Sequence, residues 1–184
     1  MDEIDLRALA PTMRRIGFTL AALLLTAPLL AATPAETLAP SLRPLAFLVG
    51  SCWRGVFPDG HAADTHCFTA DYGGAFVRDR HVVTGGPRPY SGESLYRWDA
   101  AERQILFAYY ASDGGFDSGR VAPVDAGLDF PDQVFAEADG SRMTLRSHWT
   151  RDGADALLIV DEMRTGNEWR PVRRMRLVRV PPGS

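Results

Sequence analysis

Ionisable side chains gather in two neighbouring segments of the chain, where they could form a polar site. Arg78, Arg80 and His81 lie in the first segment, and Glu93 lies in the second, just after a turn at 85–88. If the segments pair across that turn as a hairpin, the carboxylate of Glu93 comes near an arginine. A buried pair of this kind is costly and would indicate a polar ligand site, whereas an exposed pair contributes under ~1 kcal/mol.

Strand alternation decides which of these side chains can share an interior. Successive residues of a strand point to opposite faces, so the interior set is either Arg78 and Arg80 with Glu93, or His81 with Tyr96. We favour the first set, because arginine binds carboxylate-bearing ligands through planar, bidentate contacts. Tyrosines would add aromatic walls with hydroxyl tips. The predicted ligand is a small amphipathic or anionic molecule, and the predicted ligand-binding residues are Arg78, Arg80, Glu93, Tyr96 and Tyr109.

The two cysteines, Cys52 and Cys67, allow two interpretations. An even pair is typical of a disulfide in an oxidising compartment. A metal site could instead draw on His61, His66 and Cys67, but these residues lack the repeated short spacing of a zinc motif. We therefore predict a disulfide and no metal. If that disulfide lies on the outer face of the first hairpin, the strand period turns His66 inward.

Composition excludes several kinds of chemistry. All 20 basic residues of the 184-residue chain are arginine, so no lysine can form a Schiff base or hold a phosphate in a P-loop. The run Gly92-Glu-Ser94-Leu-Tyr96 lacks the second glycine and the following helix of a nucleophile elbow. A net charge of −3 argues against nucleic-acid binding. We predict no catalytic residue and no cofactor, and the sequence leaves the oligomeric state open.

Residues 1–32 are predicted to be a signal peptide for export. Arg14 and Arg15 precede the uncharged run 16–30, and small residues follow that run, which is the order of a secretory signal. Met13 is a better-placed start than the first residue. A membrane anchor is the alternative, since roughly 20 uncharged residues can span a bilayer, but prolines and threonines interrupt them. We expect a periplasmic or secreted bacterial protein with no stable membrane span after cleavage.

The remaining chain is predicted to be a linker, 33–44, and one β-domain, 45–181. Turn signals separate ten segments of strand length, and no helical periodicity is sustained beyond a short turn at 38–47. Charged residues alternate on both faces of the segment 76–83, which favours a barrel with a wet interior, although a sheet edge also carries such charges. We predict an all-β, up-and-down antiparallel barrel of about ten strands, with one stretch long enough for a crossover, 122–133. The segments are 47–57, 64–70, 76–84, 90–98, 104–110, 119–124, 134–138, 143–150, 156–163 and 168–180.

Two motifs resemble known barrel families. The run Leu45-Ala-Phe-Leu-Val-Gly50-Ser-Cys-Trp53-Arg-Gly55 resembles the opening of lipocalin-like, or calycin, barrels. This resemblance implies that Trp53 closes the barrel floor and that Arg176 or Arg179 packs over it. The run Gly92-Glu-Ser-Leu-Tyr96-Arg-Trp-Asp99, with 107–115, resembles an exported bacterial family of unknown function that is similar to nitrobindin-type barrels. Those barrels hold haem through a histidine near the C-terminus, and here no histidine follows His148.

The leading functional hypothesis is an exported barrel that binds a small molecule and performs no covalent chemistry. A periplasmic enzyme is the alternative, with Glu93 and His81 or His66 as acid and base and an arginine holding an anion. A structural or interaction module with a filled barrel is the third. The barrel interior distinguishes these three hypotheses. An open cavity of roughly 300 Å³ or more with a mixed lining favours binding.

Overall fold

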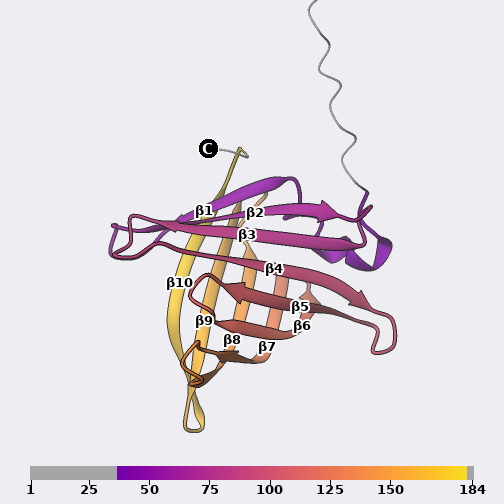
Figure 1. Cartoon of the computed structure of the whole chain (residues 1–184). Coiled ribbons are helices and arrows are strands. Elements are labelled where there is room, and N and C mark those ends of the chain that lie inside the picture. Colours follow the sequence, from indigo (N-terminus) through magenta and orange to yellow (C-terminus); the bar gives the residue numbers. More distant parts are fainter. Residues whose placement is uncertain (1–36, 182–184) are drawn as a thin grey trace, which may run out of the picture. The chain divides into compact units, whose positions relative to one another are not determined.

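The computed structural model describes residues 37–181, which form a closed barrel of ten antiparallel strands and one short 3₁₀ helix (Figure 1). Each strand pairs with its neighbours in sequence, and β1 pairs with β10 to close the barrel. The predicted all-β, up-and-down architecture is confirmed. The elements are η1 (Pro40–Leu45), β1 (Ser51–Val56), β2 (Ala63–Asp71), β3 (Phe76–Thr84), β4 (Tyr90–Asp99), β5 (Gln104–Ala111), β6 (Phe116–Val124), β7 (Gly127–Ala136), β8 (Arg142–Arg151), β9 (Ala156–Thr165) and β10 (Glu168–Val180).

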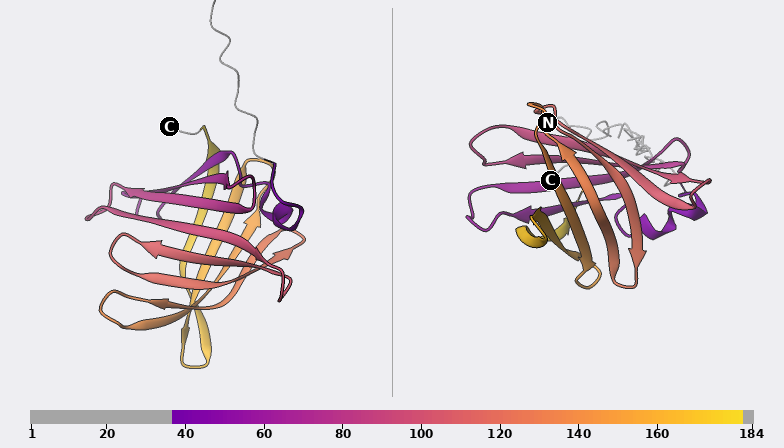
Figure 2. Two further views of the ribbon diagram at one scale, coloured as in Figure 1. Left: turned by 45° about the vertical axis from the view of Figure 1, so that its right-hand side comes forward. Right: turned by 90° about the horizontal axis from the view of Figure 1, so that it is seen from below.

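The strands coil around a common interior. Figure 2 shows β7 to β10 crossing behind β1 to β6, so that the two groups of strands face each other. In an up-and-down barrel, alternate turns lie at the same end. The turns after β1, β3, β5, β7 and β9 therefore form one rim, and the turns after β2, β4, β6 and β8 form the other.

The second rim is closed by η1 and by the core that η1 covers. Leu42, Leu45 and Leu48 are fully buried, together with the Trp53 ring. The backbone N–H of Ala39 donates to the carbonyl of Gly74 in the β2–β3 turn, which fixes the start of η1 against this rim. This packing gives the barrel an apolar floor.

Trp53 and Arg179 meet at the floor as the resemblance implied. The two residues face each other across β1 and β10, and the guanidinium of Arg179 lies 4.4 Å from the Trp53 ring centroid. The indole N–H donates to the Leu48 carbonyl. Arg176 does not share this position, because it pairs with Asp152 on the outer surface.

The structure corrects two boundaries. Residues 122–133 form no crossover. Most of them belong to a hairpin in which β6 ends at Val124 and β7 begins at Gly127. Strand β7 is hard to recognise in the sequence because of Pro131, since proline cannot donate a backbone hydrogen bond within a sheet. In the structure, Pro131 lies where the β7–β8 register shifts between Phe130 and Gln133. The short helical turn predicted within 38–47 is confirmed as η1, and because η1 includes residues 40–44 of the predicted linker, the folded domain begins before residue 45.

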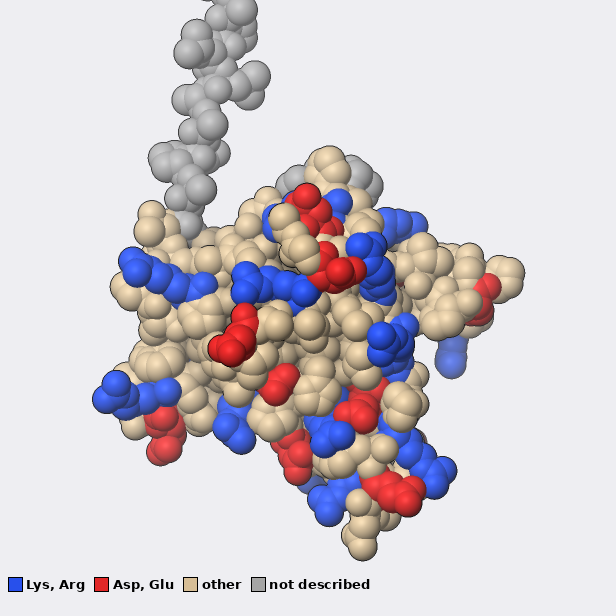
Figure 3. Space-filling view, turned by 180° about the vertical axis from the view of Figure 1, so that it is seen from behind, with Lys and Arg blue, Asp and Glu red and all other residues tan. Residues whose placement is uncertain are grey.

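Surface charges are mixed in sign. Figure 3 shows arginines interspersed with acidic side chains over one face of the barrel. Several of them are paired, including Arg176 with Asp152 and Arg146 with Glu162. Exposed pairs of this kind contribute little to stability, so the fold depends on its interior.

The predicted disulfide joins Cys52 and Cys67. These residues are direct partners across β1 and β2, and their neighbours Trp53 and His66 form the next pair. The disulfide therefore lies on the opposite face of the sheet from His66. A disulfide indicates a non-cytoplasmic, oxidising environment. The predicted signal peptide lies outside the described residues, and within 37–181 no helix is long and apolar enough to cross a membrane.

We predict that the double variant Cys52→Ser/Cys67→Ser unfolds more easily than the wild type. The bridge spans a sequence separation of 15 residues, and its loss should lower the free energy of unfolding by about 3 kcal/mol by freeing the unfolded chain. Urea unfolding measures the change. Adding a reductant to the wild type should reproduce it, and equal urea midpoints for oxidised and reduced protein would contradict the prediction.

Candidate functional site

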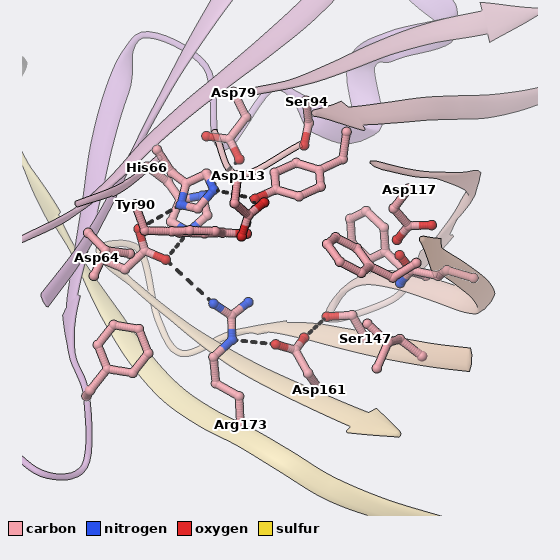
Figure 4. Close-up of a pocket in the computed structure, with 18 of the residues that line it drawn as sticks. Asp64, His66, Asp79, Tyr90, Ser94, Asp113, Asp117, Ser147, Asp161 and Arg173 are labelled. Carbon is pink, nitrogen blue, oxygen red and sulfur yellow. Dashed lines mark hydrogen bonds and ion pairs between the residues drawn. The ribbon is translucent and has the colours of Figure 1, made fainter. Parts of the chain in front are cut away.

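A cavity of about 720 Å³ occupies the barrel on the side away from η1. It is bounded at its mouth by the β1–β2 turn near Asp59, by the β3–β4 turn 86–89, and by Asp113 in the β5–β6 turn. Aromatic and aliphatic side chains cover much of its wall, and charged groups enter it from several sides (Figure 4). The apolar wall consists of Phe57, Val83, Tyr96, Phe107, Phe130, Phe135, Leu145 and Trp149.

A chain of five hydrogen bonds runs through the polar side of the cavity. Asp79 Oδ2 lies 2.8 Å from His66 Nδ1, and His66 Nε2 lies 3.1 Å from Asp64 Oδ2. The second oxygen of Asp64 lies 2.9 Å from His81 Nδ1. From His81 Nε2 the chain continues to the hydroxyl of Tyr109 at 3.0 Å, and from there to the hydroxyl of Tyr90 at 2.8 Å. The chain thus connects the buried Asp79 to the half-buried tyrosines.

The strand period explains how these residues meet. Asp64 and His66 are two residues apart on β2, as are Asp79 and His81 on β3, so each Asp-x-His unit presents both side chains to one face. In the register of these strands, His66 stands directly opposite His81. Their rings stack with centroids 4.7 Å apart and an interplanar angle of 10°. Two identical short motifs on paired strands therefore build the centre of the site.

Gly92 makes room for the contact between His81 and Tyr109. It is the β4 partner of His81. A Cβ atom at this position would lie 2.5 Å from the Tyr109 hydroxyl and 2.6 Å from His81 Nε2. The hydrogen bond crosses β4 where the strand has no side chain.

Electrostatics keep His66 charged. Burial by itself lowers the pKa of His66, because it removes water from the charged ring, but Asp79 and Asp64 outweigh this effect and raise the pKa to about 10. Burial by itself raises the pKa of Asp64, yet hydrogen bonds from His66 and His81 hold it well below its usual range. The centre is an imidazolium that donates to a carboxylate on each side.

The tyrosines stay protonated. Burial raises the pKa of Tyr109 far above its ordinary value, and burial also raises the pKa of Tyr90. Each hydroxyl therefore keeps a proton to donate and an oxygen to accept, so the hydrogen-bonded chain continues without a break from Asp64 through His81 to Tyr109 and Tyr90.

A second group of polar residues approaches from β8, β9 and β10. Arg173 donates to Asp161, and its Nη1 lies 3.5 Å from Asp64 Oδ2. Ser147 donates to Asp161 and accepts from the Trp149 indole N–H at 3.0 Å. Figure 4 shows these contacts on the side of the cavity across from Asp79 and Ser94. Asp64 thus joins the two groups.

Asp64, His66 and His81 are also a possible metal-ligand set, with one ligand atom from each within 4.8 Å of the others. The nitrogens that face Asp64 already carry its hydrogen bonds. A ring nitrogen coordinates a metal in the plane of its ring, and the nearly parallel rings of His66 and His81 do not aim at one point. In the observed geometry these nitrogens are hydrogen-bonded to Asp64, and coordination of a metal ion would require one of the two imidazole rings to rotate.

The preferred interior set of the sequence analysis is wrong. Glu93 pairs with Arg78 and Arg80 as the hairpin predicted, but all three lie on the outer face, where the Arg80 side chain is 69% exposed. The neighbouring residues in the same strands, whose side chains point to the opposite face, line the cavity instead: Asp79, His81 and Ser94. Burying the three charges of the predicted set, which would have few further partners inside the barrel, costs more free energy than burying the residues that line the cavity. Strands β3 and β4 therefore turn the predicted set outward.

The alternative set is present. His81 and Tyr96 both line the cavity, together with the predicted Tyr109, and His66 points inward. An acid–base pair of Glu93 with His81 does not form, because the two face opposite sides of the sheet. Sequence reasoning missed Asp64, Asp79, Asp117, Asp161 and Arg173, all of which line the cavity. The repeated Asp-x-His spacing of β2 and β3 was the signal that could have found the first two.

Comparisons with known proteins support the fold. No family model matches the chain, and no curated protein sequence matches it. A solved structure, the crystal structure of Rv2717c from M. tuberculosis, superposes with a TM-score of 0.53 at 17% identity, covering 78% of this chain and 99% of that chain. That structure is likewise a ten-stranded antiparallel barrel. At this identity the similarity shows the barrel fold alone.

We predict that the free energy of unfolding falls as the pH rises from 6.5 towards 10. The folded pKa of His66, about 10, exceeds its ordinary 6.5, so its stabilising effect is complete below 6.5 and is lost as the pH approaches the folded value. The slope should reach at most ~1.4 kcal/mol per pH unit. Urea unfolding across this range measures it, and ¹⁵N shifts of the ring report the protonated His66 directly.

The control for this profile is His148→Gln. It removes an outer histidine that contacts Asp129 and leaves the buried chain intact, so the fall with pH should persist. A flat wild-type profile, or a neutral His66 ring near pH 7, would contradict the prediction.

We also predict that Gly92→Ala destabilises the barrel by roughly 1–3 kcal/mol, since the added methyl breaks a buried hydrogen bond. The loss of the Tyr109–His81 contact should appear as a changed His81 ring signal in NMR spectra. Gly86→Ala is the matched control, because a Cβ there meets nothing closer than 3.6 Å. Equal thermal midpoints for the two variants would count against the prediction.

Proposed function

We propose that this protein is a barrel that binds a small amphipathic molecule in its interior. The observation that carries the proposal is the cavity of about 720 Å³, whose lining combines aromatic and aliphatic side chains with a set of charged groups. Ligand pockets are commonly ~300–1,000 Å³, largely apolar, with a few placed polar groups. The mouth between the turns near Asp59, Pro87 and Asp113 provides an entrance.

Two features of the interior favour binding over the alternatives. A structural module would fill its barrel, and this barrel leaves a large open volume. An enzyme of the kind considered from the sequence needs Glu93 beside a histidine, and Glu93 is on the outer face. The cavity's own histidines are held by neighbouring side chains at both ring nitrogens.

We infer that the protein acts outside the cytoplasm. The disulfide between Cys52 and Cys67 supports this location, and the basic, apolar and small-residue order of 14–35 supports export. We also propose that the protein is a calycin-like barrel, and the Trp53–Arg179 contact at the floor supports this proposal.

Binding is tested with Nile red, a neutral amphipathic dye whose fluorescence rises in apolar surroundings. We expect saturable binding to the wild type that also quenches the emission of Trp149, a cavity residue. Ala62→Trp, at the mouth, should weaken binding about tenfold or more, which is ~1.4 kcal/mol or more.

The matched control is Ala101→Trp, an exposed position in the β4–β5 turn at the closed rim. It adds the same aromatic ring away from the mouth and should bind the dye as the wild type does. If the two variants bind Nile red equally, the dye does not enter the cavity and the proposal fails.

A further inference from the structure

We propose that the cavity selects an organic ammonium ion, a protonated amine attached to an aromatic or other apolar body. This inference rests on the proposed binding function and names the class of its ligand. It replaces the anion expected from the sequence, because that expectation depended on Arg78 and Arg80 facing inward.

Charge around the cavity favours a cation. Six aspartates line it, and they face three arginines and the imidazolium of His66. Carboxylates therefore outnumber cations by two. One of the arginines, Arg146, is further neutralised by Glu162, which lies outside the lining. A cation entering this low-dielectric space meets a net attraction.

The buried positive groups of the cavity are already occupied, whereas Arg88, an exposed side chain at the mouth, has no ion-pair partner among the described residues. Both ring nitrogens of His66 face carboxylates. Arg173 directs Nε to Asp161 and Nη1 to Asp64. An incoming anion would have to compete with these buried carboxylates for the same donors, which gives it little to gain.

Acceptors, in contrast, remain available. Asp79 is 2% exposed, and its Oδ1 is buried without a hydrogen-bond partner among the residues that the structure describes. Asp117 is 4% exposed, and the contact recorded for its carboxylate is the backbone N–H of Ser118. A buried acceptor without a donor is costly, and an ammonium group supplies up to three donors.

The two acceptors belong to one row of the barrel wall. Asp79 faces Ser94 across β3 and β4, Ser94 faces Tyr109 across β4 and β5, and Tyr109 faces Asp117 across β5 and β6. All four side chains line the cavity. The two carboxylates stand at opposite ends of the row, three interstrand spacings or roughly 14 Å apart along the wall, so one ammonium group contacts one carboxylate and the row offers it a choice of two.

Aromatic rings complete the recognition. Phe130 and Trp149 have centroids 4.8 Å apart, and Phe107 lies 5.6 Å from Phe130. Ring faces attract cations and pack against an apolar body equally well. The same wall therefore suits both parts of the proposed ligand.

The inference is tested with three probes of similar size: 2-phenylethylammonium, 2-phenylethanol and phenylacetate. Each is used to displace Nile red from the wild type. We expect the ammonium to bind about tenfold or more tightly than the alcohol, and phenylacetate to bind most weakly. Equal displacement by the ammonium and the alcohol, or stronger displacement by phenylacetate, would overturn the inference.

Asp117→Asn tests the site itself. This change removes one charge with little change of shape and should reduce the ammonium's advantage over the alcohol severalfold, with both affinities measured on the same variant. Asp125→Asn, an exposed aspartate in the β6–β7 turn, should retain the full advantage. An ammonium preference that survives both Asp117→Asn and the mouth variant Ala62→Trp would place the cation outside the cavity and overturn the inference.

The two levels of proposal fail differently. If Nile red does not bind, the binding function itself fails and this inference falls with it. If Nile red binds and the ammonium shows no advantage, the cavity binds small molecules of another class, and only the inference is lost.

Discussion

The buried imidazolium of His66 is the group on which the site depends. A charge inside a barrel is tolerated only when opposite charges and hydrogen bonds replace the lost water. Asp64 and Asp79 provide both, from the same strand and from the next one. Removing either carboxylate would leave the ring without compensation, and removing the ring would leave two buried carboxylates. The three residues therefore require one another, and the remaining polar groups arrange themselves around them.

This ion triad also determines the rest of the cavity wall. Asp64 is hydrogen-bonded to His81 and attracts Arg173, and His81 is hydrogen-bonded to Tyr109. The backbone adapts to this chain where Gly92 leaves space for a ring and a hydroxyl. Because all these residues take part in one network, a substitution at one should be felt along the chain.

The two ends of the barrel differ: one is a closed, apolar floor and the other is an open, charged mouth. The leucines of η1 and the Trp53–Arg179 contact close one rim, and the cavity opens at the other rim of the described barrel. Asp59 and Asp113 stand at this mouth. Desolvation in such a pocket strengthens any interaction with charge.

Local patterns in the sequence determined much of this fold. Period-two alternation and frequent turn signals defined ten strands, and the pair of cysteines indicated a disulfide, whereas the floor position of Trp53 was implied by the resemblance to lipocalin-like barrels. Strand β7 was misplaced because Pro131 and Gly127 suggest a loop, and only the bulge in the closed sheet accommodates them. The face of each strand could not be read from β3, since charges occupy both alternate sets. Barrel closure decided it: His66 on β2 stands opposite His81, Arg173 arrives from the far end of the chain, and the inner set becomes the one whose charges can neutralise each other. That balance depends on contacts among β2, β3 and β10, which no local pattern contains.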